Sequence, residues 1–232
     1  MCGRYSLTHS AEAIAARFDV DALRGYQPRF NVAPTDTMPV VRGGDKTDGQ
    51  RELSELRWGL VPFWADDLKI GSRMINARSE TVANKPAFRA AFRRRRCLVP
   101  NDGFYEWVEL DGKKWPIRIT VGDDQIGAFA GLWESWTDDD RVVETYTILT
   151  TAAASVVADL HNRMPVWAPE EHWDTWLNDD EHAETTLTSM IEAFPGDDVA
   201  YWPVSRELNR PGPDDPALIE PIDDKRLPRR RL

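Results

Sequence analysis

Cysteine is scarce in this chain of 232 residues, which contains only Cys2 and Cys97. Two cysteines at positions 2 and 97 do not make a disulfide framework or a zinc site. The simplest interpretation is a protein of a reducing compartment. We therefore expect a cytoplasmic protein, and the sequence predicts neither a metal ion nor another cofactor.

Long apolar runs are also missing. The N-terminus has no apolar segment of signal-peptide length, and no stretch approaches the roughly 18 apolar residues of a membrane span. Internal repeats and a glycine-rich phosphate loop are absent as well. These absences exclude a membrane protein and a P-loop nucleotide binder, and we expect a soluble monomer.

Basic residues are fewer than acidic ones. The chain has 29 Lys and Arg and 39 Asp and Glu, which give a formal net charge of -10. This balance argues against a general polyanion binder. The acidic residues cluster in apparent turns, a pattern typical of a solvated acidic coat, so a halophilic source is a hypothesis. Seven arginines between positions 73 and 96 nevertheless predict a local basic face.

The hydrophobic pattern predicts an α+β protein with a mainly antiparallel β core. Helical spacing indicates helices over residues 9–18, 84–92, 152–160, 169–177 and 181–194. Short apolar runs separated by turns predict antiparallel strands between residues 97 and 151, and Asp111-Gly112 is a hairpin signal. We expect one domain over residues 1–210, followed by a flexible, arginine-ended tail over residues 211–232.

Cys2 is the candidate reactive residue, because a small side chain after the initiator favours removal of Met1. The α-amine of Cys2 would then condense with an aldehyde, and the neighbouring thiol would close onto the imine as a thiazolidine. With ordinary pKa values of about 7.7–8.0 for the amine and about 8.5 for the thiol, the amine attacks first. The alternative is a small hydrophobe at the start of a buried strand, which position alone favours.

Several short strings in a fixed order make this sequence similar to the SRAP (SOS response-associated peptidase) family. The similarity extends from Met1 to about Ser205, and it is the set, rather than any one string, that is specific. The strings are Met1-Cys2-Gly3-Arg4, Asn31-Val32-Ala33-Pro34, Arg57-Trp58-Gly59-Leu60-Val61-Pro62, Asn76-Ala77-Arg78-Ser79-Glu80, Gly103-Phe104-Tyr105-Glu106-Trp107, Leu160-His161-Asn162-Arg163-Met164-Pro165 and Pro203-Val204-Ser205.

The resemblance implies a fold of twisted sheets that form a half-open barrel flanked by helices. It also implies a function in the response to DNA damage, in which an N-terminal cysteine, exposed by self-removal of Met1, crosslinks to abasic sites in single-stranded DNA. Carried over to this sequence, Cys2 is the nucleophile, and its catalytic partners are Asn76, Glu106 and His161.

The chemistry of these residue types agrees with those roles, although each has an ordinary alternative. A carboxylate and an imidazole suit the proton transfers that open the abasic sugar. Strand alternation predicts that Glu106 faces away from Tyr105 and Trp107, and the alternative is an exposed strand glutamate. For His161 the alternative is a helix-end cap, and for Asn76 a turn asparagine.

The candidate DNA contacts are arginines, aromatic residues and two groove residues. Guanidinium groups bind phosphate bidentately, and bases stack on aromatic rings. Arg163 has the alternative of pairing with an acid inside the protein. We expect Trp58 in the core and the following residues at the DNA: Arg4, Asn31, Pro34, Trp64, Arg78 and Arg163.

Two other functions compete with covalent capture of abasic sites. One is an N-terminal-nucleophile peptidase or amidase, in which the thiol of Cys2 attacks a peptide carbonyl. The other is a binding module for single-stranded DNA that uses only arginines and tryptophans. Only the crosslinking function requires the α-amine of Cys2.

Overall fold

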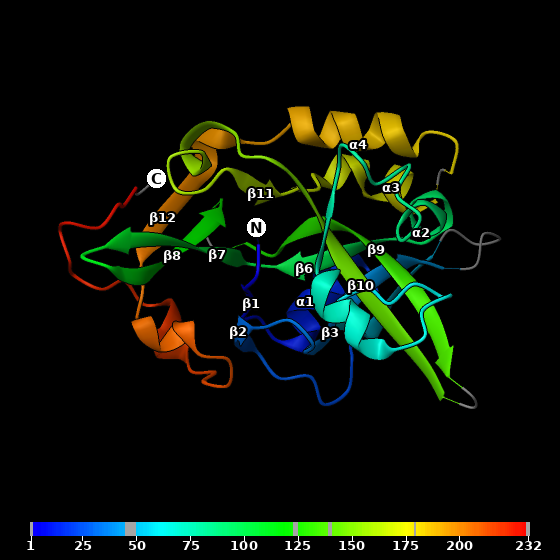
Figure 1. The fold of residues 1–232 in the computed structure, drawn as a ribbon, viewed down its shortest axis with the longest axis horizontal. Helices are drawn as coiled ribbons and strands as arrows, with labels where there is room; N and C mark the ends of the chain where they lie inside the picture. Colours follow the sequence, from blue (N-terminus) through cyan, green and yellow to red (C-terminus); the bar gives the residue numbers. More distant parts are fainter. Residues whose placement is uncertain (1, 45–49, 123–124, 139–140, 179, 231–232) are drawn as a thin grey trace.

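Two β-sheets make up most of the protein (Figure 1). The structure is a computed structural model that describes residues 2–44, 50–122, 125–138, 141–178 and 180–230. The five-stranded sheet has the order β12 (Val199–Pro203), β8 (Lys113–Val121), β7 (Gly103–Leu110), β1 (Tyr5–Leu7) and β2 (Arg29–Val32). The seven-stranded sheet contains β11 (Arg163–Pro165), β10 (Arg141–Ala152), β4 (Arg51–Trp58), β3 (Thr37–Gly43), β6 (Arg96–Asn101) and β9 (Gly127–Asp138), with β5 (Asn76–Arg78) paired to β10.

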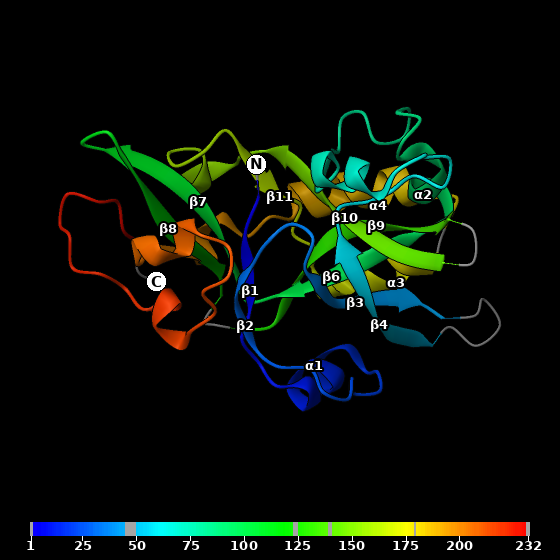
Figure 2. The same cartoon turned by 60° about the horizontal axis from the view of Figure 1, so that its bottom comes forward.

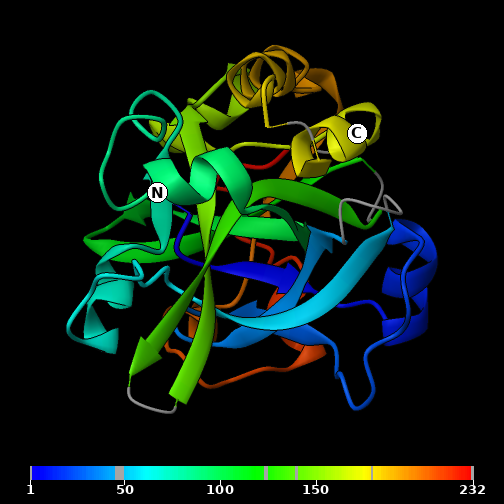
Figure 3. The same cartoon turned by 90° about the vertical axis from the view of Figure 1, so that its right-hand side faces the viewer.

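The larger sheet closes into a barrel, because β9 pairs with both β6 and β10. Strands β4, β3, β6, β9 and β10 thus form a ring of five, in which only β4 and β10 run parallel. The long β9–β10 hairpin extends from this ring toward the viewer in Figure 3. The predicted α+β class with a mainly antiparallel core is confirmed, and so is the Asp111-Gly112 hairpin, which joins β7 to β8.

Helices are short and lie outside the sheets. Helix α1 has Ser10 as its N-cap, whose side chain accepts a hydrogen bond from the Ala13 backbone, as the sequence predicts. Helices α3 and α4 lie side by side along the barrel (Figure 1). The α-helices are α1 (Ala11–Phe18), α2 (Arg89–Arg94), α3 (Trp173–Asn178) and α4 (Ala183–Glu192), and the 3-10 turns are η1 (Leu68–Arg73), η2 (Ser155–Val157), η3 (Glu170–His172), η4 (Gly196–Asp198), η5 (Arg206–Asn209) and η6 (Pro216–Ile219).

Two predicted helices are wrong in extent. Residues 84–88 form turns, so that the helix expected to begin near Asn84 starts only at Arg89. The helix expected over residues 152–160 is reduced to η2. The Ala153 backbone N–H donates to the Asn162 carbonyl, and this closure of β10 onto β11 leaves no room for a longer helix.

Strand β1 lies in the middle of the molecule, with β7 and β8 on one side and the barrel on the other (Figure 2). Tyr5 is fully buried, and its hydroxyl is 2.7 Å from that of Tyr146 on β10. Trp58 packs edge-on against Tyr5 with ring centroids 5.2 Å apart, and its indole N–H donates to the Ile75 carbonyl. Trp58 is a core residue, as predicted, and these contacts join β1 to the barrel.

The segment after residue 210 was predicted to be a flexible tail, and in the structure it packs against the five-stranded sheet. Asp214 accepts hydrogen bonds from the backbone N–H groups of Phe30 and Asn31. Leu218 and Leu227 are buried, and Arg230 exchanges two backbone hydrogen bonds with Tyr201 of β12. The proline and charge content suggested a tail, whereas these apolar and backbone contacts hold the segment in place.

Buried Asp102 holds the segment that joins β1 to α1. Its carboxylate accepts hydrogen bonds from the hydroxyls of Ser6 and Thr8 and from the Thr8 backbone N–H, and it pairs with Arg118 at 3.2 Å. Burial alone would raise the pKa of Asp102, but these bonds, together with one from His9, lower it to about 2. The ionised carboxylate is therefore part of the folded state.

The Asp102→Asn variant should be less stable at pH 7 by about 3 kcal/mol in the free energy of unfolding, because an amide cannot satisfy these donors and the buried Arg118 loses its partner. The depressed pKa contributes stability above the ordinary carboxyl value of about 3.9, and this contribution is lost as pH falls toward 2. Denaturant titrations should show that the difference in the free energy of unfolding between the wild type and Asp102→Asn becomes smaller below pH 4. The control is Asp111→Asn at an exposed ion pair, and a gap of constant size between pH 7 and pH 3 would contradict the assignment.

Candidate active site at Cys2

Cys2 lies directly before β1 and is completely buried. Its Sγ donates a weak hydrogen bond of 3.7 Å to the Arg4 carbonyl. Burial raises the pKa of the thiol well above its ordinary value, and the nearby charge of Glu106 raises it further. The thiol of Cys2 is therefore neutral at physiological pH, unlike the thiolate that cysteine nucleophiles use.

Asn76 approaches Cys2 from the other sheet. It is the first residue of β5, whose pairing with β10 places Asn76 opposite Ile148. The Nδ2 atom of Asn76 donates a hydrogen bond of 2.7 Å to the Cys2 carbonyl, which fixes the peptide of the candidate nucleophile. The Oδ1 atom is buried and has no hydrogen-bond partner among the described residues, so it can receive a proton donor of a ligand.

Glu106 lies on the face of β7 that strand alternation predicts. Tyr105 and Trp107 point to the opposite side, where they bond to the Phe30 carbonyl and to Asn209. Glu106 is only 3% exposed, which excludes the alternative of a surface glutamate. Desolvation raises the pKa of its carboxyl, although the nearby His161 acts in the opposite direction.

His161 faces Glu106 across a distance of 3.7 Å between Nδ1 and Oε1. It lies in the loop before β11, and its Nδ1 is 3.0 Å from both the backbone nitrogen and the carbonyl oxygen of Arg163. Nδ1 thus accepts from the Arg163 N–H in one tautomer and can donate to the carbonyl in the other. The side chain is 27% exposed, so this imidazole connects the buried carboxyl with solvent.

Two of the residues predicted to contact DNA, Arg4 and Asn31, form hydrogen bonds within the protein. Arg4 is 9% exposed, and its guanidinium donates to Asn31 Oδ1 at 2.7 Å and to the Leu208 carbonyl at 3.4 Å. The Asn31 amide nitrogen donates to the carbonyls of Arg210 and Pro213. Arg4 and Asn31 therefore connect β1 and β2 to the segment that follows β12.

The remaining predicted contacts differ in accessibility. Arg163 forms a two-pronged ion pair with Glu80, so its alternative as the partner of an acid is the one that the structure supports. Arg78 is exposed and Pro34 is partly exposed. Trp64 is 49% exposed and lies next to Phe63, which is 61% exposed. Accessible cation and aromatic surface thus remain at Arg78 and Trp64.

Comparison with known proteins identifies the family of the chain. The family model for SRAP, "SOS response associated peptidase", matches residues 1–211. The chain belongs to the SRAP family.

Relatives of this SRAP chain include two proteins of Bacillus subtilis. The abasic site processing protein YoqW is 39% identical over 95% of this chain and 99% of the relative. The abasic site processing protein YoaM is 40% identical over 95% of this chain and 98% of the relative. The abasic site processing protein HMCES of Gallus gallus is 28% identical over 85% of this chain and 67% of its own. A crystal structure from Bacteroides thetaiotaomicron superposes with a TM-score of 0.85 at 26% identity, covering 95% of this chain and all of the other.

Sequence reasoning about this SRAP chain assigned no role to Glu80, although it lies in one of the family strings. Glu80 could have been noticed as an acidic residue two positions after Arg78. Its partner Arg163 is distant in the sequence, and the two become adjacent only through the pairing of β5, β10 and β11. Asp102 was missed for the same reason.

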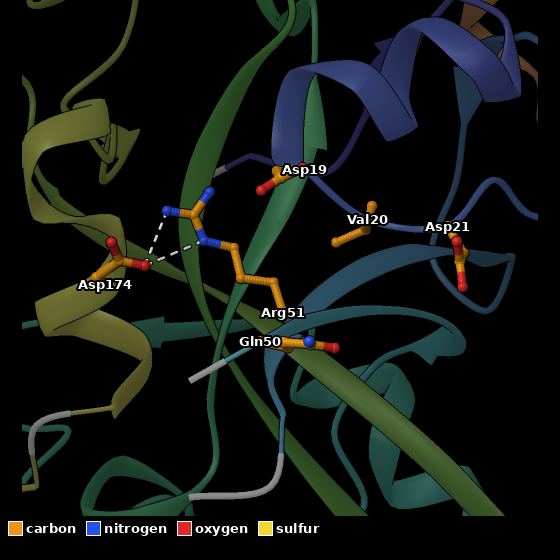
Figure 4. Close-up of a pocket in the computed structure, with 6 residues that line it drawn as sticks. All are labelled: Asp19, Val20, Asp21, Gln50, Arg51 and Asp174. Carbon is orange, nitrogen blue, oxygen red and sulfur yellow. Dashed lines mark hydrogen bonds and ion pairs between the residues drawn. The ribbon is translucent and has the colours of Figure 1, made fainter. Parts of the chain in front are cut away.

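A separate hollow of about 560 Å³ lies near the end of α1 (Figure 4). Arg51 crosses it and bonds to Asp174 and to the Phe18 carbonyl. The lining side chains include the carboxylates of Asp19, Asp21 and Asp174 but no cysteine, so Cys2 is the stronger candidate site. Within the described ranges, no group of three or more His, Cys, Asp or Glu side chains is placed to hold a metal ion, and no helix has the length and apolar character of a membrane span.

Replacing Glu106 with Gln should stabilise the fold at neutral pH. The raised pKa means that the neutral carboxyl contributes stability that is complete below about pH 4 and is lost as pH rises through the folded value. Gln is neutral throughout, so thermal unfolding at pH 7.5 should show a higher midpoint for the variant, with the difference vanishing near pH 4. Glu109→Gln, at an exposed position of the same strand, is the control, and a Glu106→Gln variant less stable at pH 7.5 would contradict the desolvation argument.

Proposed function

We propose that this SRAP chain captures abasic sites in single-stranded DNA as a covalent thiazolidine on Cys2, after removal of Met1. The observation that carries the proposal is the convergence of Asn76, Glu106 and His161 on the buried N-terminal cysteine. Family membership and the names of the relatives as abasic site processing proteins support the same substrate class. Capture would shield the lesion from strand breakage.

The reaction uses both nucleophiles of Cys2. The α-amine forms a C–N bond with the aldehyde carbon of the opened sugar, and the carbonyl oxygen leaves as water. The Sγ–C bond then closes the ring, while the thiol proton ends on the former imine nitrogen. A thiol whose pKa is raised stays neutral until the imine has formed, which favours attack by the amine first.

Glu106 and His161 divide the proton transfers. The raised pKa of Glu106 keeps a proton available in a desolvated position, which suits a general acid for loss of water from the amine adduct. His161, partly exposed and 3.7 Å from Glu106, can exchange that proton with solvent or with the sugar oxygen. Asn76 holds the Cys2 carbonyl and offers Oδ1 to the attacking amine or to a sugar hydroxyl.

The DNA strand would contact the accessible groups around this site. Arg78 is two residues from Asn76 and can bind a flanking phosphate, while Trp64 offers a surface for base stacking and Pro34 an apolar edge. Arg4 and Asn31 would act indirectly, by holding β1 and β2. Since the net charge is -10, binding depends on these local groups, and its salt dependence should be shallow because few phosphates are neutralised.

The peptidase alternative also uses Cys2, and self-removal of Met1 would be an instance of it. A peptidase needs a reactive thiolate, whereas burial and Glu106 favour the neutral thiol here. The third candidate, a binding module without covalent chemistry, has no use for a buried carboxyl beside an N-terminal cysteine. Dependence on the α-amine separates covalent capture from both alternatives.

Protein lacking Met1, mixed with an oligonucleotide that carries one abasic site, should give a shifted band on a denaturing gel. A retained N-terminal extension should abolish the band, because it blocks the α-amine, and Cys2→Ser should leave only a labile imine that borohydride traps. The matched intact oligonucleotide is the control, and a mass spectrum shows whether Met1 is absent. Normal crosslinking by the protein with the N-terminal extension would contradict the amine mechanism.

Substitutions of the proton-transfer groups should separate capture from binding. Glu106→Gln and His161→Gln should each slow capture about 100-fold, since general acid–base catalysis contributes roughly 10²–10⁴. Affinity for intact single strands, measured by fluorescence anisotropy, should stay near the wild-type value. Glu109→Gln and His182→Gln, both at exposed positions, are the controls. Equal loss of binding and capture would show instead that the two residues are structural.

A further inference from the structure

Strand β2 contains a bulge where it pairs with β1. The two residue steps from Tyr5 to Leu7 on β1 lie opposite three steps on β2, from Val32 back to Arg29. A bulge of this kind leaves backbone groups outside the ladder of hydrogen bonds. Because β2 is also the last strand in the order of the five-stranded sheet, these groups need partners from another part of the chain.

Asp214, in the segment after β12, supplies those partners. Its Oδ1 atom accepts hydrogen bonds from the backbone N–H groups of Phe30, at 2.6 Å, and of Asn31, at 3.1 Å. Its Oδ2 atom pairs with the Arg29 side chain. The Phe30 carbonyl accepts from the Tyr105 hydroxyl at 2.7 Å, so the bulge is held by β7 as well. One carboxylate therefore replaces the neighbouring strand that β2 lacks at this point.

The bulge also determines the direction of the Asn31 side chain. Asn31 is only 2% exposed, and its amide nitrogen donates to the carbonyls of Arg210 at 3.1 Å and of Pro213 at 2.8 Å. These two bonds use both N–H groups of the amide. Its oxygen faces the other way and accepts from the Arg4 guanidinium at 2.7 Å. The segment after β12 thus fixes Asn31, and Asn31 in turn holds Arg4.

This chain of hydrogen bonds ends beside the candidate site. Arg4 lies directly before β1, and its carbonyl accepts the weak hydrogen bond from the Cys2 thiol. Asn31 lies three residues before Pro34, which is partly exposed. A displacement of the bulge would therefore move the Arg4 guanidinium and the turn at Pro34 together.

We infer that Asp214 is a positioning residue, which holds the bulge of β2 and with it the side chains of Asn31 and Arg4 at the candidate site. Asp214 lies beyond residues 1–211, the part of the chain that the family model matches. Any contact that Asn31 or Arg4 makes with DNA would start from the geometry that Asp214 sets. The inference rests on the proposed function for its kinetic consequence but not for its structural one.

Two substitutions at position 214 separate the roles of the two carboxylate oxygens. Asp214→Ala removes both, whereas Asp214→Asn keeps Oδ1 as the acceptor for the two N–H groups of the bulge and loses the ion pair with Arg29. The matched control is Asp223→Ala in the same segment, because the Asp223 side chain is 83% exposed and lies 3.8 Å from Arg229. This control removes the same charge and leaves the bonds of Asp214 in place.

Asp214→Ala should lower the rate of crosslinking at limiting abasic oligonucleotide by about tenfold, because small displacements around a reacting centre cost up to about 10²-fold. The half-saturating DNA concentration should rise more than the maximal rate falls, since the candidate catalytic partners of Cys2 lie on other elements. Asp214→Asn should recover most of the rate, and Asp223→Ala should match the wild type. Equal losses in Asp214→Asn and Asp214→Ala would overturn the inference, because the Arg29 ion pair and not the bulge would then be responsible.

A second measurement does not require the proposed function. Amide hydrogen exchange at Phe30 and Asn31 in DNA-free protein should be about tenfold faster or more in Asp214→Ala, because both N–H groups lose their acceptor. Exchange at Ala130, which donates to the Val166 carbonyl in the barrel, should not change. This comparison separates local release of the bulge from a general loss of stability.

The two measurements together distinguish failure of the inference from failure of the proposed function. Unchanged exchange at Phe30 and Asn31 would overturn the inference even if the wild type crosslinks. Faster exchange in a protein that never crosslinks would retain the structural role of Asp214 and refute the proposed function instead. Faster exchange with an unaltered or increased rate of capture would overturn the positioning role, since the segment after β12 would then have no effect on the site or would obstruct it.

Discussion

The hydrogen bond from Asn76 to the Cys2 carbonyl joins the two sheets at the candidate site. Asn76 is attached to the barrel through β10, and Cys2 leads into β1 of the five-stranded sheet. Each sheet alone would offer only part of the site. The seam between the sheets brings Cys2 from one side and the Asn76 amide from the other, so the surroundings of Cys2 depend on both sheets.

Desolvation in this seam determines the protonation of the site. Burial raises the pKa of both the Cys2 thiol and the Glu106 carboxyl, and the charge of Glu106 raises that of the thiol further. The site therefore favours neutral acids that can give up a proton during a reaction. His161, placed at the edge with 27% exposure, provides the exchange with water that two buried acids lack.

The arginines near the site divide into two groups by what they contact. Arg4 and Arg163 form hydrogen bonds with Asn31, Glu80 and backbone carbonyls inside the protein. Arg78 is accessible. In a protein with ten more acidic than basic residues, this division leaves few cations for a polyanion. The exposed aromatic surface at Trp64 and Phe63 lies outside this division.

The sequence by itself determined the fold class, the family and the identity of the residues at Cys2, because strand alternation, turn residues and short strings are local properties. Alternation alone placed Glu106 opposite Tyr105 and Trp107, and the Asp111-Gly112 turn fixed a hairpin. Only the tertiary structure decided the closure of the barrel, the short η2 turn in place of a helix and the packing of the segment after residue 210. It also decided that Arg163 pairs with Glu80 and that Asp102 anchors β1, since both depend on strands that meet far from one another in the chain. Burial of the seam, which sets the proton chemistry of Cys2 and Glu106, is likewise a property of the packed sheets and has no local signal.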